Sequence, residues 1–202
     1  ATNVIVWIGA NGGSGSNYGG GGGGAAKGTL GNKNGGNGAS GLVSVTYEGL
    51  PEPCSASSTS GTYFINRVSV EGAVTDFNND GTGYTPGGYN DYSVSHIAEQ
   101  IPGGGLNIRV ILSGGTQYLS AWIDWNQDGD FSDPGENIYS VAIGFISTYF
   151  GVVVPPETSP GLYKIRIRSR QGSSTISPCG SYSDGETEDY LLRVVADCPA
   201  LI

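Results

Sequence analysis

Residues 162–168 read Leu-Tyr-Lys-Ile-Arg-Ile-Arg, and from residue 163 onward apolar and basic side chains alternate along this stretch. Successive side chains of an extended chain point to opposite faces, so the apolar residues share one face and the basic residues share the other. The basic residues are Lys164, Arg166 and Arg168. The stretch therefore predicts a β-strand whose apolar face packs on a core and whose basic face lies in water.

Short runs of β-branched, aromatic and aliphatic residues recur along the chain, and clusters of Gly and Pro at 102–105 and 155–161 mark turns between them. The further runs expected to form strands are 62–70, 106–112, 117–125, 138–146, 149–154 and 189–196. Many short strands joined by turns are typical of an antiparallel sandwich. The predicted fold class is all-β: an antiparallel β-sandwich over residues 58–202, preceded by a small glycine-rich domain.

The first 50 residues differ in composition from the rest, because they hold 17 of the 36 glycines and only three charged side chains. Apolar runs at 4–8 and 43–47 predict a strand at each end of the glycine tracts. We expect an ordered, β-flanked domain over residues 1–50. A flexible linker is the alternative, because glycine loses the most backbone entropy on ordering. Residues 51–57, with prolines on both sides of Glu52, predict a linker between the two domains.

The opening motif VIVWIGANGG and the later motif NGASGLVSVTY make this first part resemble the glycine-rich domains of bacterial surface and phage tail proteins. That resemblance implies glycine tracts packed as polyglycine-type left-handed helices, which the missing Cβ makes sterically possible. The first strand is also a candidate for completing the sheet of a neighbouring molecule, because a long glycine-rich segment separates it from the second domain. Its residues are Val4, Ile5, Val6, Trp7 and Ile8.

Charge and cysteine content limit which partners the chain can bind and in which compartment it works. Nine basic against 18 acidic residues give a formal charge of −9, which repels phosphate backbones and predicts no nucleic-acid partner. No run of 18 apolar residues occurs, so no membrane insertion is predicted. Three cysteines, no methionine and an alanine at position 1 predict a processed chain that is secreted or held at the cell surface.

Oxygen-bearing side chains are concentrated directly after a predicted strand. They are Asp124, Asn126, Asp128, Asp130, Asp133 and Glu136. Their alternate spacing, followed by Gly129, lets a short loop converge on a hard cation, and without one the carboxylates would repel each other. We expect calcium in a β-hairpin loop rather than an EF-hand, since a strand precedes the loop and its twelfth position is Gly135. The alternative is a solvated turn whose side chains bond their own backbone.

Three ordered motifs carry a resemblance to a family: AWIDWNQDGDFSDPGE at 121–136, SPCG at 177–180 and GETEDY at 185–190. With them, residues 54–196 resemble the GEVED domain of secreted Bacteroidetes proteins, although Thr187 stands where the family name has Val. The resemblance implies a β-sandwich of multidomain proteins exported by the type IX route, with no established catalytic activity. It also implies a disulfide between Cys54 and Cys179. The competing pairing is Cys179 with Cys198, and Cys198 otherwise has no assigned partner.

The acidic residues of the third motif allow several roles. Alternation puts Glu186 and Glu188 on one face, where they would supply further oxygens to the cation loop or pair with an arginine such as Arg166, Arg168 or Arg170. A glycosidase with paired carboxylates is the catalytic alternative. We expect no enzyme, because the chain has a single histidine, His96, and no G-x-S-x-G motif.

Two function classes remain. The first is a non-catalytic secreted structural or adhesive module that self-associates, or binds neighbouring domains of a surface protein, in an extracellular filament or adhesin. The second is a carbohydrate-binding accessory domain of a secreted hydrolase, with polysaccharide as its partner. The sugar-stacking candidates are Tyr84, Tyr89 and Tyr92. The state of the purified chain discriminates between them, because polymers favour the first class and a monomer retarded by polysaccharide favours the second.

Overall fold

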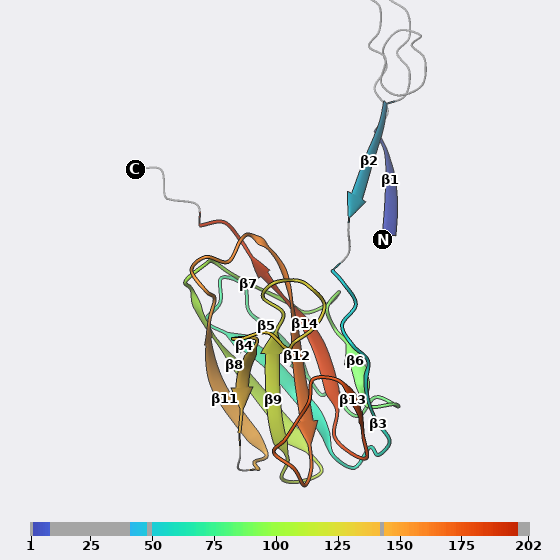
Figure 1. Ribbon diagram of the computed structural model, residues 1–202, viewed down its shortest axis with the longest axis vertical. Helices are drawn as coiled ribbons and strands as arrows, with labels where there is room; N and C mark the ends of the chain where they lie inside the picture. Colours follow the sequence, from blue (N-terminus) through green and yellow to red (C-terminus); the bar gives the residue numbers. More distant parts are fainter. Residues whose placement is uncertain (1, 9–40, 48–49, 142–143, 198–202) are drawn as a thin grey trace, which may run out of the picture. The chain divides into compact units, whose positions relative to one another are not determined.

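A computed structural model of the 202-residue chain describes four stretches of it (Figure 1). They are residues 2–8, 41–47, 50–141 and 144–197. These stretches are strands, turns and loops without a helix, which confirms the all-β fold class. The chain divides into two compact units, Ala1–Gly49 and Leu50–Ile202. The glycine tracts between residues 9 and 40, and with them the expected polyglycine packing, lie outside the described residues.

The first unit contains two strands, β1 (Thr2–Ile8) and β2 (Gly41–Tyr47), which form a two-stranded antiparallel sheet. Their register is continuous from Thr2 opposite Tyr47 to Ile8 opposite Gly41. β-branched and apolar residues at 4–8 and 43–47 favour extended backbone, and strands are found at both positions. The strand expected to pair with a neighbouring molecule therefore pairs with β2 on one of its edges.

The second unit is built from two larger sheets that face each other (Figure 1). The first has the order β11-β8-β4-β5 and is antiparallel throughout. Its strands are β4 (Phe64–Glu71), β5 (Phe77–Asp80), β8 (Gly105–Ser113) and β11 (Ser147–Val153). This architecture is sandwich-like, as predicted.

The second large sheet has the order β10-β9-β12-β14-β6, with β7 pairing further along β14. Its strands are β6 (Tyr89–Asp91), β7 (Ile97–Gln100), β9 (Tyr118–Ile123), β10 (Asn137–Ser140), β12 (Gly161–Arg170) and β14 (Thr187–Val194). The pairs are antiparallel except that β6 and β7 run parallel to β14, so the sheet is mixed. The run 138–146, expected as one strand, contains only the end of β10, because β10 stops at Ser140.

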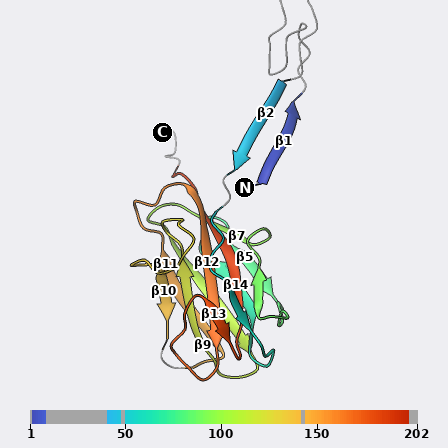
Figure 2. The same cartoon turned by 45° about the vertical axis from the view of Figure 1, so that its right-hand side comes forward.

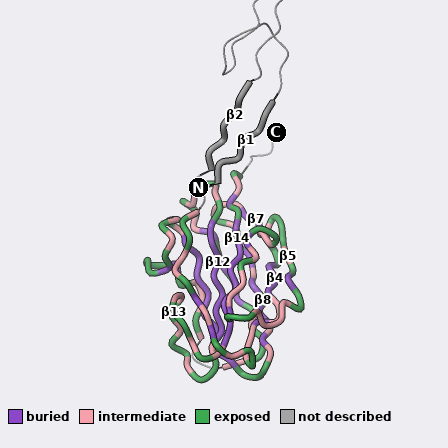
Figure 3. The backbone as a smooth tube through the Cα atoms, turned by 90° about the vertical axis from the view of Figure 1, so that its right-hand side faces the viewer, coloured by how far each residue is buried: buried purple, intermediate pink, exposed green. Residues whose placement is uncertain are grey.

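The core lies between these two sheets and is filled by alternate residues of their strands. Val68 and Val110 come from the first sheet, and Ile165, Ile167 and Leu192 come from the second; each is at most 1% exposed. The odd-numbered apolar face of the 162–168 stretch thus packs on the core, as the alternation predicts. In Figure 3, β12 and β14 form the buried middle of the unit.

The even-numbered face of β12 is buried as well, which corrects the prediction that it lies in water. Lys164 is 7% exposed, and Arg166 and Arg168 are each 1% exposed. Lys164 pairs with Asp91 of β6, and the two arginines are covered by a third, small parallel sheet of β3 (Ala56–Ser58) and β13 (Gly180–Tyr182) together with the chain before each strand (Figure 1 and Figure 2). Backbone carbonyls of this cover accept hydrogen bonds from the guanidinium groups, so the charges are buried with partners rather than exposed.

The cover also changes the role of residues 51–57, which were expected to be a linker. They belong to the second unit, which begins at Leu50. Cys54 forms a disulfide with Cys179, as the resemblance implies, and β3 begins at Ala56. Pro51 packs so closely on Gly129 that a Cβ there would lie 2.6 Å from the proline ring. The prolines therefore stiffen a packed strand entry instead of a tether.

Candidate functional site

The loop of residues 124–136 joins β9 to β10, and its two ends are held from inside the protein. Asp124 is 3% exposed and accepts hydrogen bonds from the backbone N–H groups of Gln127 (2.7 Å) and Gly129 (3.0 Å). Glu136 is 1% exposed and accepts from the N–H groups of Trp125 (3.2 Å) and Asp133 (3.1 Å). Burial raises the pKa of both carboxyl groups. These two predicted ligands therefore brace the loop from both ends.

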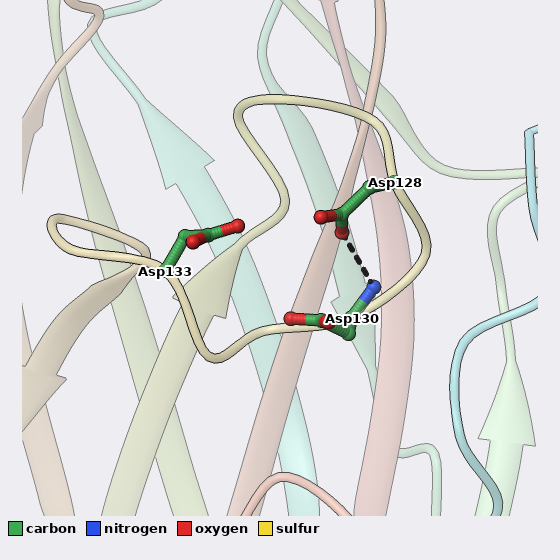
Figure 4. A group of neighbouring side chains, drawn as sticks. All are labelled: Asp128, Asp130 and Asp133. Carbon is green, nitrogen blue, oxygen red and sulfur yellow. Dashed lines mark hydrogen bonds between the residues drawn. The ribbon is translucent and has the colours of Figure 1, made fainter.

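The remaining predicted ligands lie on the solvent side of the same loop. The carboxylates of Asp128, Asp130 and Asp133 are exposed, and oxygens of all three lie within 4.8 Å of one another. Figure 4 shows these side chains turned toward the space that the loop encloses. Asn126 donates its side-chain N–H to Asp128 (2.9 Å) and to Asp133 (2.6 Å). The structure thus brings four of the six predicted ligands together and places Asp124 and Glu136 behind them.

This donor set consists entirely of oxygen once the Asn126 amide is turned to present its carbonyl group. Carboxylate and amide oxygens in a compact loop suit a hard divalent cation, and such a cation would replace the Asn126 N–H as the positive partner. Backbone geometry supports the tight curl, because Gln127 and Gly129 adopt φ values of 62° and 87°. The loop is thus chemically suited to calcium, and it also holds its shape through its own hydrogen bonds.

A second charged constellation lies on the covered face of β12. Arg166 donates to both carboxylate oxygens of Asp189, at 2.8 Å each, and both side chains are at most 1% exposed. The same guanidinium donates to the carbonyls of Cys54 (2.7 Å) and Pro178 (3.1 Å), one on each side of the disulfide. The pair therefore joins the sheet to both covering segments.

Arg168 lies beside this pair and has no carboxylate within salt-bridge distance among the described residues. Its guanidinium donates instead to the carbonyls of Ser57, Ser177, Cys179 and Gly180. Its guanidinium carbon also lies 4.1 Å from the centre of the Tyr182 ring. Burial lowers the pKa of Arg168 to about 10, so it stays charged at neutral pH. These contacts tie β3 and β13 to the large sheet.

The acidic residues of the GETEDY motif face two directions. Glu186 accepts the backbone N–H groups of Ile65 (3.1 Å) and Thr85 (2.8 Å). Glu188 accepts the Tyr190 hydroxyl (2.8 Å), which in turn accepts from Asn79 (3.0 Å). Neither glutamate forms an ion pair or joins the 124–136 loop in the described part of the chain, so both predicted roles differ from the structure.

The register between β12 and β14 explains why Asp189, and neither glutamate, pairs with an arginine. Arg166 lies directly opposite Asp189 in the antiparallel pair, and directly opposite residues share a face of the sheet. Glu188 lies opposite Ile167 and therefore faces the core. Burial raises the pKa of Glu186 to about 7 and that of Glu188 to about 8. Sequence reasoning missed Asp189 as the arginine partner, although its alternation with Glu188 was the available signal.

The tyrosines predicted to stack on sugar are engaged in the fold. The Tyr89 hydroxyl donates to Asp189 (2.9 Å), and Tyr92 stacks on Tyr190 with ring centres 5.5 Å apart. Tyr84 covers Gly61, where a Cβ would lie 2.6 Å from its ring. His96, the single histidine, shares a hydrogen bond with the adjacent Ser95. None of these rings stands free as a stacking platform.

Comparison with known families gives one finding for this site. Residues 118–193 match the family model of the GEVED domain. The match begins at β9 and ends within β14, so it contains the 124–136 loop, both buried arginines and the GETEDY motif. It is narrower than the predicted range of 54–196.

Neither the curated proteins nor the solved structures gave a match. The likeness of the first part to other glycine-rich domains and the Bacteroidetes origin stay predictions. No helix among the described residues is long and apolar enough to cross a membrane. The disulfide fits an extracellular protein. Over residues 118–193, therefore, this chain is similar to the GEVED domain family.

Proposed function

We propose that this chain is a non-catalytic extracellular structural module that self-associates into a filament or surface adhesin, with its fold braced by the disulfide and by calcium. The observation that carries the proposal is that every acidic residue of the GETEDY motif binds groups inside the protein's own fold. Glu186 and Glu188 bind backbone and tyrosine groups, and Asp189 holds Arg166. A paired-carboxylate hydrolase needs its two acids at a substrate surface. These three residues are at most 1% exposed.

Calcium is proposed for the 124–136 loop on the basis of its donor set. Asp128, Asp130 and Asp133 would supply carboxylate oxygens and Asn126 a carbonyl oxygen, while Asp124 and Glu136 hold the loop ends. The ion would supply charge neutralisation and cross-link the loop, with no step of a reaction. Isothermal titration of the calcium-free chain tests this. We expect binding by the wild type and by Asp80→Asn, an exposed aspartate outside the loop, and loss of binding in Asp133→Asn. Equal binding of calcium by both variants would show that calcium does not bind to this loop.

Assembly is tested on the purified full chain. Sedimentation velocity over a concentration series, with electron microscopy of the same samples, should show regular polymers that grow with concentration. Repeating both measurements with a calcium chelator separates the two parts of the proposal. Polymers that persist with the chelator would support self-association and would show that calcium is not needed for it. A chain that stays monomeric at every concentration contradicts the structural role.

A polysaccharide-binding accessory role is the second candidate, and one observation favours it. The outer face of the four-stranded sheet has an open hollow of about 370 Å³, lined by Glu71, Arg109 and Tyr149 with two neighbouring hydroxyl residues. An exposed ring beside charged hydrogen-bonding groups suits a sugar. Affinity electrophoresis in polysaccharide gels tests it. Retardation that disappears in Tyr149→Ala supports this role, and equal migration in all gels excludes it.

A further inference from the structure

The edges of the two large sheets differ in how well they are protected. An edge strand presents unpaired N–H and C=O groups, so proteins shorten it, charge it or interrupt it with a bulge. β5 has four residues and ends in the exposed Asp80. β10 also has four residues, and its register shifts between Asn137 and Tyr139. β6 and β7 have three and four residues. These edges are poor templates for another strand.

β11 has none of these protections. Its seven residues, Ser-Thr-Tyr-Phe-Gly-Val-Val, include no charge and no proline. Its register with β8 is unbroken from Ser147 to Val153. Within the described stretches β11 pairs with β8 alone, and it forms the outer border of its sheet (Figure 1). Its outer face also exposes two large hydrophobic side chains, since Tyr149 is 55% and Val153 is 64% exposed.

The edge is held rigidly by the buried side of the same strand. Phe150 and Val152 are 7% and 6% exposed and belong to the core. The Phe150 ring stacks on Tyr139 with centres 4.0 Å apart, and the Tyr139 hydroxyl lies 2.6 Å from the hydroxyl of Thr148. A strand fixed in this way loses little further entropy when another strand pairs with it.

The first unit offers a strand of matching length. β1 also has seven residues and no charged residue, and among the described residues β2 is its single partner. A two-stranded sheet is marginally stable in water by itself, whereas addition to a larger sheet satisfies one more edge. Neither strand contains a charged residue, so no like charges would meet along the paired edges.

We propose that β11 of one copy receives β1 of a second copy as an added strand of the four-stranded sheet. This inference rests on the proposed self-association and names its surfaces. The contact is heterologous, because β11 and β1 are different surfaces, so each copy has one donor and one acceptor. Such a contact propagates into an open filament unless the rotation between copies closes a ring.

Blocking the acceptor is the first test. The double variant Tyr149→Lys/Val153→Lys puts two charges on the edge strand. We expect it to form no polymers even at ten times the concentration at which the wild type assembles. The matched control is Val74→Lys/Val94→Lys, which adds the same charges at sites 60% and 92% exposed. Urea unfolding shows that each variant is folded. If the acceptor variant assembles like its control while the wild type polymerises, the β11 surface is wrong and self-association stands.

Complementation identifies the donor. The variant Val4→Lys/Val6→Lys keeps β11 and blocks β1, so it should be monomeric alone and should form 1:1 dimers with the acceptor-blocked variant. A donor-blocked chain that dimerises by itself would indicate pairing of β11 with β11 and would overturn the assignment of β1. A peptide of residues 1–8 adds a measurement that does not depend on the folding of the variant. It should bind the donor-blocked chain and not the acceptor-blocked chain, and equal binding to both would contradict the proposal.

Discussion

The covered face of β12 and the 124–136 loop are both dense in charge, yet they treat it in opposite ways. The arginine cluster, Arg166 and Arg168 with Asp189, is at most 1% exposed; backbone carbonyls bind both guanidinium groups, and the Asp189 carboxylate binds that of Arg166. In the loop, three aspartates are exposed, and two of them, Asp128 and Asp133, accept the side-chain N–H groups of Asn126. The difference separates charge that completes a fold from charge that is available to a ligand.

The largest loss of stability is expected from a substitution at Asp189, the carboxylate inside the buried arginine cluster. The substitution Asp189→Asn leaves Arg166 buried without its counter-charge, and removal of one partner of a buried pair destabilises proteins by about 3–5 kcal/mol. Urea unfolding at pH 7 measures the loss. The matched control is Glu99→Gln, which breaks the partly exposed pair with Arg193 and should change stability far less, because solvent screens an exposed pair. Equal losses in the two variants would show that burial of the arginine cluster does not matter.

The disulfide should have the next largest effect. The double variant Cys54→Ser/Cys179→Ser releases a constraint across a sequence separation of 125 residues, and such bridges stabilise by about 2–4 kcal/mol. We expect the variant to stay folded, because Arg166 and Arg168 still bind the carbonyls of both covering segments. Near-ultraviolet circular dichroism checks the packing, and urea unfolding gives the loss. A variant without near-ultraviolet signal would show that the disulfide alone holds the covering segments in place.

These expectations show what alternation in a sequence can and cannot settle. The pattern at 162–168 predicts the strand and its core face correctly. It assigns the other face to water, because a period of two cannot reveal a cover formed by segments outside the strand, one of which contains Cys54, 112 residues from Arg166 along the chain. The positions of Cys54 and Cys179, taken with the family resemblance, were the signal for that cover.

The same limit applies to the candidate site. Spacing in the sequence selected six candidate oxygen ligands, but spacing does not distinguish Asp124 and Glu136, which brace the backbone, from the exposed aspartates. The short strands β3, β5, β6, β7 and β13 were missed because they have only three or four residues each and several are polar. Their pairing depends on neighbours in space rather than on local pattern.

Two buried acids, Glu188 on the core face of β14 and Glu186 just before that strand, should make stability depend on pH. Burial raises the pKa of Glu188 to about 8 and that of Glu186 to about 7, above the usual range of a glutamate. The folded state then holds protons that the unfolded state releases, so their contribution to stability is present at low pH and is lost as pH rises toward 8. We expect the free energy of unfolding to fall between pH 5 and about 8, and Glu188→Gln to flatten this slope. A slope unchanged in Glu188→Gln would show that Glu188 is ionised throughout.

The smallest effect on the fold is expected in the loop. Without calcium, Asp133→Asn should change the free energy of unfolding by no more than about 0.5 kcal/mol, since the side chain is exposed and its removal relieves like-charge repulsion with Asp128 and Asp130. With free calcium at 100 times its dissociation constant, ligand binding would stabilise the wild type by about 2.7 kcal/mol, and Asp133→Asn should lose that gain. The control Asp80→Asn should respond to calcium as the wild type does. A large loss in calcium-free buffer would mean that the loop, like the arginine cluster, uses its charge to hold the fold.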